Sequence, residues 1–197
     1  SGEVQCWIPV QDGRPWHCQI HNDNFYYGVN TSPVDDRLVV GLRWFAVPKM
    51  SEANRVTFAA PDNADGYFDM MGMPQPTFHY VEDSTDVETI DAMVKDLTEV
   101  ASFIGTPIPE AATFVQYLPG GSALHLHGCN RIGTSVADSV ADQNCKAWGV
   151  DNLYLGGSGV IPNGIACNPT LTAVALALRA CTDILGLDTT KTFHQGA

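Results

Sequence analysis

The chain has 197 residues, of which 45 % are hydrophobic, and a formal net charge of −12 at pH 7. This length suffices for one large domain or parts of two, and the hydrophobic content argues against disorder. The acidic excess argues against a nucleic-acid partner, because phosphate binding requires clustered lysines and arginines. No apolar stretch is long enough to span a bilayer, so we expect no membrane partner. Secreted and cytoplasmic locations are both compatible with the sequence.

The first half of the chain predicts three strands. Residues 38–47 (LVVGLRWFAV) are rich in β-branched and aromatic side chains and end at Pro48. Residues 55–59 and 77–81 predict two further strands, separated by a loop at residues 61–76 that is rich in turn residues.

An amphipathic helix is predicted after these strands. Thr85 and Glu88 form a capping-box pattern, and apolar residues then recur at helical spacing from Val87 to Ile104. Gly105 is a typical C-terminal stop. The following residues 106–109 resemble a linker, so we expect a change of domain there.

The last ninety residues predict a short buried strand at residues 152–155, a glycine-rich turn and a second helix. Asn168 is the expected N-cap, Pro169 the first helical residue, and Gly186 the stop after a long apolar run. Because this run is apolar nearly all round, we expect the helix to be buried.

The six cysteines are scattered without a C-x-x-C pair, which argues against a zinc ribbon. We expect free, mostly buried thiols, although a secreted protein would permit disulfides.

Two histidines, His125 and His127, lie two residues apart, so on an extended chain they face the same side. No third potential metal ligand lies at a spacing typical of metal sites, so we expect no metal site here. From these residues alone, hydrogen-bonded structural histidines and catalytic histidines both stay open.

Asn168 allows two interpretations. It is a plain helix cap, or it stands at a helix N-terminus whose free N–H groups and partial positive charge bind an anionic group. Likewise, Gly156, Gly157 and Gly159 form either a tight turn or a nucleotide-contacting loop, although their spacing is not G-x-G-x-x-G.

The order of these features is more specific than any one of them. A histidine, then Asn-Leu-Tyr-Leu-Gly-Gly at residues 152–157, then Asn-Pro-Thr-Leu-Thr at 168–172 and an apolar helix resembles the C-terminal signature of the glucose–methanol–choline (GMC) oxidoreductase family. Within that family the chain is most similar to the pyranose-oxidase group. The similarity extends upstream to residues 15–28 (PWHCQIHNDNFYYG), 36–38 with 43–45, and 73–78 (MPQPTF).

The resemblance implies a fold of the α+β or α/β class. Residues 1–108 would form part of a substrate-binding β-sheet domain with helices. Residues 109–197 would contain the active-site segment and the returning C-terminal segment of a Rossmann-like FAD domain, ending in a buried helix.

The resemblance also implies roles for individual residues. His125 falls on the catalytic histidine and Asn168 on its asparagine partner. The implied substrate-binding residues, including a mobile loop, are Gln19, His21, Asp23, Phe25, Tyr26, Tyr27, Arg43 and His127. The implied FAD-binding residues are Gly157, Ser158, Asn168, Pro169 and Thr170.

The chain departs from the family pattern at two positions and in one whole unit. His127 replaces a glycine and Asn130 replaces a second histidine, which leaves the substrate and the oxidised carbon open. Nothing before Pro109 resembles the N-terminal Rossmann unit, so we expect a second polypeptide to supply it.

The implied activity is oxidation of a secondary hydroxyl of a pyranose or glycoside, at carbon 2 or 3. Hydride passes to FAD, and dioxygen (giving hydrogen peroxide) or a quinone reoxidises it, in a higher oligomer. Two alternatives stay open: a GMC enzyme acting on a non-sugar alcohol of secondary metabolism, and a non-catalytic subunit or proteolytic fragment that stabilises a partner chain.

Overall fold

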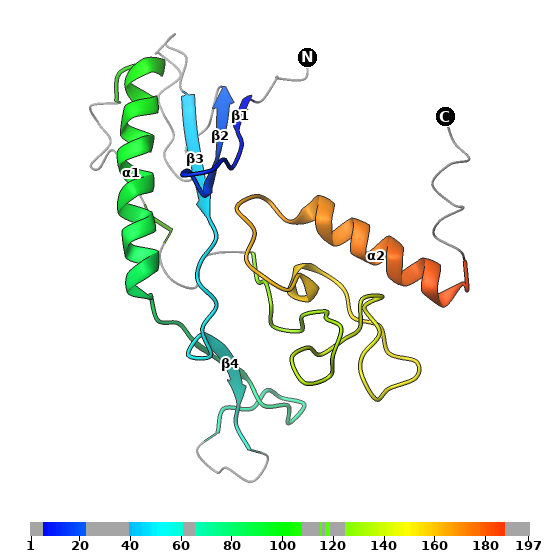
Figure 1. The fold of residues 1–197 in the computed structure, drawn as a ribbon. Coiled ribbons are helices and arrows are strands. Elements are labelled where there is room, and N and C mark those ends of the chain that lie inside the picture. The colour runs from blue at the N-terminus through cyan, green and yellow to red at the C-terminus, as the bar shows by residue number, and fades with distance from the viewer. Residues whose placement is uncertain are drawn as a thin grey trace. The chain divides into compact units, whose positions relative to one another are not determined.

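The protein has an α+β fold, which is one of the two classes that the family resemblance implies. The structure is a computed structural model that describes residues 6–22, 40–60, 66–107, 115, 117–118 and 125–187. The elements in these ranges are β1 (Cys6–Ile8), β2 (Trp16–Asn22), β3 (Val40–Ala46), β4 (Arg55–Phe58), β5 (Pro76–His79), α1 (Ser84–Ile104), the 3₁₀ turn η1 (Ser158–Val160) and α2 (Thr170–Ile184) (Figure 1).

The elements belong to two compact units, each built from separated segments of the chain. The first unit contains residues 1–49, 82–117 and 165–167, and the second contains residues 50–81, 118–164 and 168–197. The assignment of residues 1–108 and 109–197 to two family domains stays a prediction.

The first unit is built on an antiparallel sheet in the order β1-β2-β3. Its β3 confirms the strand predicted at residues 38–47. Strands β1 and β2 were not predicted, although β2 alternates apolar and polar residues from Trp16 to His21, which is a strand signal. Trp16 lies opposite Ala46 and Cys18 opposite Trp44, so these side chains share one face of the sheet. Trp16 and Cys18 are buried there.

Helix α1 begins two residues earlier than the capping-box pattern indicates. The carboxylate of Asp83 accepts a hydrogen bond from the Thr85 amide at 2.8 Å, which makes Asp83 the N-cap. The predicted capping box at Thr85 and Glu88 is therefore wrong, because a better acceptor precedes it. The predicted stop is confirmed, since the Gly105 amide donates to the Ala101 carbonyl at 3.0 Å and closes the last turn.

Asp96, in the middle of α1, fastens this helix to the sheet. Its Oδ2 accepts from Trp16 Nε1 at 2.6 Å, and its Oδ1 pairs with the Arg14 guanidinium. Burial, reinforced by the Asp96 charge, raises the pKa of the Cys18 thiol to about 12. These contacts place α1 over the face that carries Trp16 and Cys18, in agreement with its position beside β3 in Figure 1.

The second unit contains the hairpin of β4 and β5. The two strands confirm the predictions at residues 55–59 and 77–81, with β5 beginning at Pro76. Thr57 lies opposite Thr77, and the Thr57 hydroxyl is 2.8 Å from His79 Nε2.

A loop-rich segment at residues 125–164 packs on α2 around a small core of Cys145, Val160 and Ala180. The strand predicted at residues 152–155 is wrong. Its backbone forms only the isolated antiparallel bridge between Tyr154 and Lys146, because the chain reverses direction between these two residues and the pairing extends no further.

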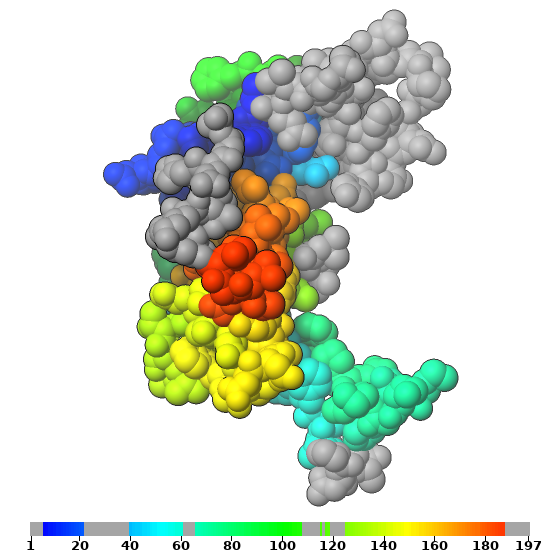
Figure 2. Space-filling model, turned by 90° about the vertical axis from the view of Figure 1, so that its right-hand side faces the viewer, coloured from blue at the N-terminus to red at the C-terminus, as the bar shows by residue number. Residues whose placement is uncertain are grey.

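Helix α2 differs from its prediction at the start and in its burial. Pro169 occupies the N-cap position without a side-chain hydrogen bond, so the predicted cap at Asn168 is wrong by one residue. Gly186, with a φ of 62°, confirms the predicted stop. The predicted burial is wrong within the described residues: Leu171 is 82 % exposed and only Ala180 is buried. Figure 2 shows the C-terminal end of α2 (red) at the surface beside the loop segment (yellow).

One side of α2 is held by hydrogen bonds to the loop segment. Asp183 accepts from the Tyr154 hydroxyl at 2.7 Å and from Asn144 Nδ2 at 2.8 Å. The apolar side chains of α2 face the unit's small core only around Leu176 and Ala180, which explains why the rest of its apolar surface is exposed.

The six cysteines are free, as expected, but most are not buried. Cys18 and Cys145 are buried, Cys167 is half-buried, and the exposed ones are Cys6, Cys129 and Cys181. Among the described residues, no helix is long and apolar enough to cross a membrane.

Candidate active site

The segment that carries His125 is held against the 3₁₀ turn η1. Three backbone hydrogen bonds of 2.9 to 3.2 Å join residues 128–132 to residues 159–161. The approach is close: a Cβ on Gly159 would stand 2.1 Å from Asn130 Oδ1, so the Asn130 side chain would have to move to admit a larger residue. The glycine-rich loop therefore serves the packing of the histidine segment.

Ser158 adds a side-chain bond to the same contact. Its hydroxyl donates to the Leu126 carbonyl at 3.0 Å, and Leu126 is the residue between His125 and His127. The backbone on which both imidazoles stand is thus tied to η1 at one more point.

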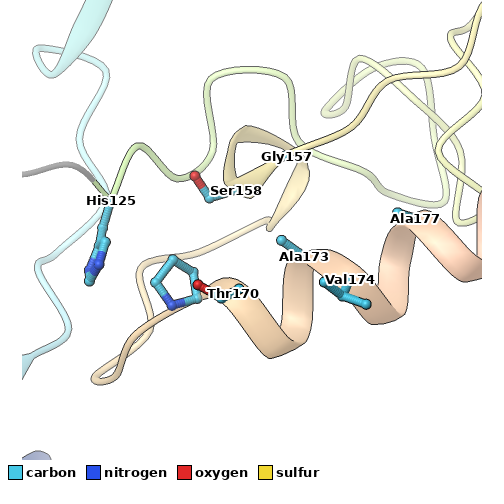
Figure 3. Close-up of a pocket in the computed structure, with 8 residues that line it drawn as sticks. His125, Gly157, Ser158, Thr170, Ala173, Val174 and Ala177 are labelled. Atoms are coloured by element: carbon cyan, nitrogen blue, oxygen red, sulfur yellow. The ribbon is translucent and has the colours of Figure 1, made fainter.

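His125 lines a cavity of about 500 Å³ between this segment and α2 (Figure 3). The other lining residues are Gly157, Ser158, Pro169, Thr170, Ala173, Val174 and Ala177. Four residues implied to bind FAD (Gly157, Ser158, Pro169 and Thr170) are therefore brought together with the implied catalytic histidine. Their roles stay predictions.

The sequence analysis missed the three lining residues Ala173, Val174 and Ala177. The sequence did contain a signal for them, because together with Thr170 they are spaced i, i+3, i+4 and i+7, which places them on one face of a helix. Small side chains on that face leave room for a flat group against the helix.

The start of α2 offers backbone donors to the cavity. Its N-cap Pro169 forms no side-chain cap, and the first bond of the helix runs from the Ala173 amide to the Pro169 carbonyl at 2.9 Å. The amides before Ala173 have no acceptor within the helix and stand at the positive end of the helix dipole. Asn168 directly precedes Pro169 and is exposed; it is not among the residues that line the cavity.

His127 lies near His125, with ring centroids 6.1 Å apart. Its Nε2 atom is buried and has no hydrogen-bond partner within the described part of the chain. Burial, and then the neighbouring His125, lower the pKa of His127 below its ordinary value, so the neutral ring is favoured. His127 is not among the residues that line the cavity, and its implied role in substrate binding stays a prediction.

Three implied substrate-binding residues lie in the first unit, on β2 and β3. Gln19 is 7 % exposed and accepts from His21 Nε2 at 3.3 Å. Arg43 lies opposite Gln19, and burial followed by the Arg43 charge lowers the pKa of His21. These three side chains form one polar set. Asp23, Phe25, Tyr26 and Tyr27 lie outside the described residues.

Comparison with known proteins identifies the family. The model of the GMC oxidoreductase family matches residues 52–177, more than half of the chain and all of the residues lining the cavity. The chain belongs to the GMC oxidoreductase family. Within this GMC family it is 41 % identical over 181 residues to a pyranose 2-oxidase of Tricholoma matsutake, which covers 90 % of this chain and 31 % of that protein.

Two other GMC relatives extend the comparison. A pyranose 2-oxidase of Lyophyllum shimeji is 40 % identical over 183 residues, covering 93 % of this chain and 28 % of that protein. A C-glycoside 3-oxidase of Arthrobacter globiformis is 36 % identical over 187 residues, covering 90 % of this chain and 33 % of that protein. The chain thus spans about a third of the length of the curated relatives it matches.

Proposed function

We propose that this chain forms the substrate and active-site part of an FAD-dependent sugar oxidase. Its substrate is a pyranose or glycoside, and the reaction converts a secondary hydroxyl at carbon 2 or 3 to a ketone. The observation that carries this proposal is the cavity shared by His125 and the uncapped start of α2. The names of the relatives, pyranose 2-oxidase and C-glycoside 3-oxidase, support a sugar as substrate and differ in the carbon they specify.

The cavity residues fit the ring end of FAD. Gly157, Ala173 and Ala177 leave space for a flat ring system, while the amides at the start of α2 suit the negative charge of its reduced form. FAD bound there supplies the acceptor for the hydride that leaves the substrate carbon. The dinucleotide part requires a Rossmann unit, which we assign to a second polypeptide or to a preceding stretch of the whole protein.

In the proposed mechanism, His125 is the base. Its imidazole takes the proton of the reacting hydroxyl, a contribution of roughly 10²- to 10⁴-fold to the rate. Asn168 hydrogen-bonds the same hydroxyl and orients the carbon–hydrogen bond. For Gln19, His21 and Arg43 of the first unit we retain the role in substrate binding that the family resemblance implies. Dioxygen or a quinone is the final acceptor, and the whole protein assembles as a higher oligomer.

The test is anaerobic reduction of the flavin by glucose in the holoenzyme that contains this chain. His125→Ala is expected to retain the flavin absorbance and to slow reduction at least about 100-fold, because the proton acceptor is lost. A matched control is His79→Ala, since His79 lies on β5 outside the cavity lining. Equal reduction rates in His125→Ala and wild type would remove His125 from the role of base.

Two further measurements separate the competing functions. Asn168→Ala with normal flavin binding but slower reduction supports the role of hydroxyl anchor, whereas an unchanged rate makes Asn168 structural. A panel of sugars, glycosides and non-sugar alcohols, with the products identified by NMR, fixes the substrate class and the oxidised carbon. Absence of flavin from the native assembly contradicts the oxidase proposal and favours a non-catalytic subunit.

A further inference from the structure

The hairpin of β4 and β5 carries a second cavity, which the proposed function does not use. Its volume is about 300 Å³. Its polar lining residues are Thr57, Tyr67, Gln75 and Thr77, and its apolar ones include Phe58 and Pro76. None of these residues lines the cavity of His125. All of them belong to the continuous stretch 50–81 of the second unit, so one hairpin alone gives this cavity its shape.

Backbone hydrogen bonds fix the walls of the second cavity. Beyond the paired strands, an isolated bridge joins Phe68 to Pro74, and the Gln75 amide donates to the Tyr67 carbonyl at 2.9 Å. The Asp69 carboxylate accepts from two backbone amides of the next turn, at 2.8 and 2.9 Å. The lining side chains therefore stand on a backbone of defined shape, which is the arrangement that a binding site requires.

The register places two hydroxyl groups of the lining next to each other. Thr57 lies directly opposite Thr77 in the antiparallel pair, so both side chains stand on one face of the hairpin. Thr57 is half-buried, and its hydroxyl lies 2.8 Å from Nε2 of His79, which does not line the cavity. This bond orients the Thr57 hydroxyl, whereas Gln75 and Thr77 are exposed. A ligand would meet one oriented hydroxyl and two solvated polar groups.

The chemistry of the lining selects the class of ligand. Among the described residues that line the second cavity, none carries a charge, so an ionic ligand gains no counter-charge from them. Hydroxyl and amide side chains both donate and accept hydrogen bonds, as the hydroxyls of a sugar do. Tyr67 is 82 % exposed and adds ring surface beside these groups. A sugar likewise combines polar edges with apolar C–H faces, and the latter suit an aromatic ring.

We propose that the second cavity is a non-catalytic binding site for one neutral sugar residue. Thr57, Gln75 and Thr77 bond its hydroxyls, and Tyr67 contacts its ring. Ligand pockets measure about 300 to 1,000 Å³, and a cavity at the lower end of this range suits a single ring. The inference does not rest on the proposed function, because it uses neither FAD nor His125. Sugar bound here is expected to have no effect on the rate of flavin reduction.

The test measures glucose binding to the whole holoenzyme by equilibrium dialysis. The flavin is first reduced with dithionite under nitrogen, so that bound glucose is not oxidised. One component of the wild-type binding curve is expected to weaken about three- to tenfold in Thr77→Val, the range for one lost hydrogen bond, and further when Gln75→Leu is added. Gln75→Leu alone should act in the same direction, and its exposed position outside β5 keeps the paired strands intact.

The matched control is Thr98→Val, because Thr98 is an exposed threonine of α1 in the other unit. It should leave the binding curve unchanged. The KM of glucose for flavin reduction should stay at the wild-type value in all of these variants, since the second cavity shares no lining residue with that of His125.

The outcomes separate this inference from the proposed function. A binding curve that is unchanged in Gln75→Leu and in the double variant overturns the second site, and so does an equal effect of Thr98→Val. Displacement of the glucose by sodium acetate or ammonium chloride at equal concentration overturns the assignment to a neutral sugar. If glucose does not reduce the wild-type flavin but its binding still depends on Gln75 and Thr77, the oxidase proposal fails and the second site stands.

Discussion

Removal of the Ser158 hydroxyl tests whether η1 positions the base. Ser158→Ala deletes the 3.0 Å bond from this hydroxyl to the Leu126 carbonyl, next to His125. Leu126 is largely exposed, so water replaces part of the lost bond, and we expect a loss of about 0.5 to 1 kcal/mol in unfolding free energy. The three backbone bonds between the two segments remain, which confines the change to the neighbourhood of the histidine.

The expected functional effect is larger than the loss of stability. A displacement of a catalytic group by about 1 Å lowers rates by up to about 100-fold, and for this partial release we expect about a tenfold lower rate of flavin reduction at saturating sugar. KM and flavin content should stay close to wild type, and Ser158→Thr should recover most of the rate because it keeps a hydroxyl. The reasoning is refuted if Ser158→Ala loses flavin while the loaded fraction reacts at the wild-type rate, since the hydroxyl would then contact the cofactor.

Three other perturbations follow from the structure. Asp96→Ala removes the acceptor of Trp16 Nε1 and of the Arg14 guanidinium, and it should lower the unfolding free energy by about 2 to 4 kcal/mol in urea titrations. Asp96→Asn keeps one acceptor oxygen and should lower the unfolding free energy by less. Gly159→Ala should lower the unfolding free energy by about 1 to 3 kcal/mol, because the added Cβ meets the Asn130 side chain. Adding Asn130→Ala to this variant should restore most of the lost free energy, whereas additive losses from the two substitutions contradict the steric argument. Because the pKa of His127 is lowered, the unfolded chain takes up a proton at this histidine at a higher pH than the folded chain does. The free energy of unfolding should therefore fall as the pH decreases below about 6.5, and it should level off below the folded-state pKa. His127→Gln should weaken this pH dependence in denaturant titrations across the same range.

Local patterns in the sequence predicted the elements whose causes are local. Helical spacing and Gly105 located α1, β-branched residues ended by Pro48 located β3, and Gly186 located the end of α2. The order of the histidine, the glycine-rich turn and the Asn-Pro-Thr segment indicated the family that the comparison then showed. These signals lie within short stretches of chain, so no tertiary contact is needed to detect them.

Other features depend on contacts between distant residues and were missed or wrong. The strand predicted at residues 152–155 is absent: Tyr154 forms one isolated bridge to Lys146, and its hydroxyl donates to Asp183 on α2, 29 residues away. The N-cap of α1 is a miss of another kind, because the carboxylate of Asp83 accepts from the amide of Thr85, only two residues away. A pattern records which bonds are available, but not which of them the folded chain forms.

The sequence by itself indicated the family and the histidine proposed as base, and it left the fold class open between α+β and α/β. Only the tertiary structure decided that Gly157, Ser158 and one face of α2 share a cavity with His125, and that Thr57, Gln75 and Thr77 line a second one. The physical reason is that strand register and helix rotation select the neighbours of a side chain. Both are decided by packing between segments far apart in the chain, as when Asp96 fastens α1 over one face of the sheet and leaves the other face to His17 and Phe45.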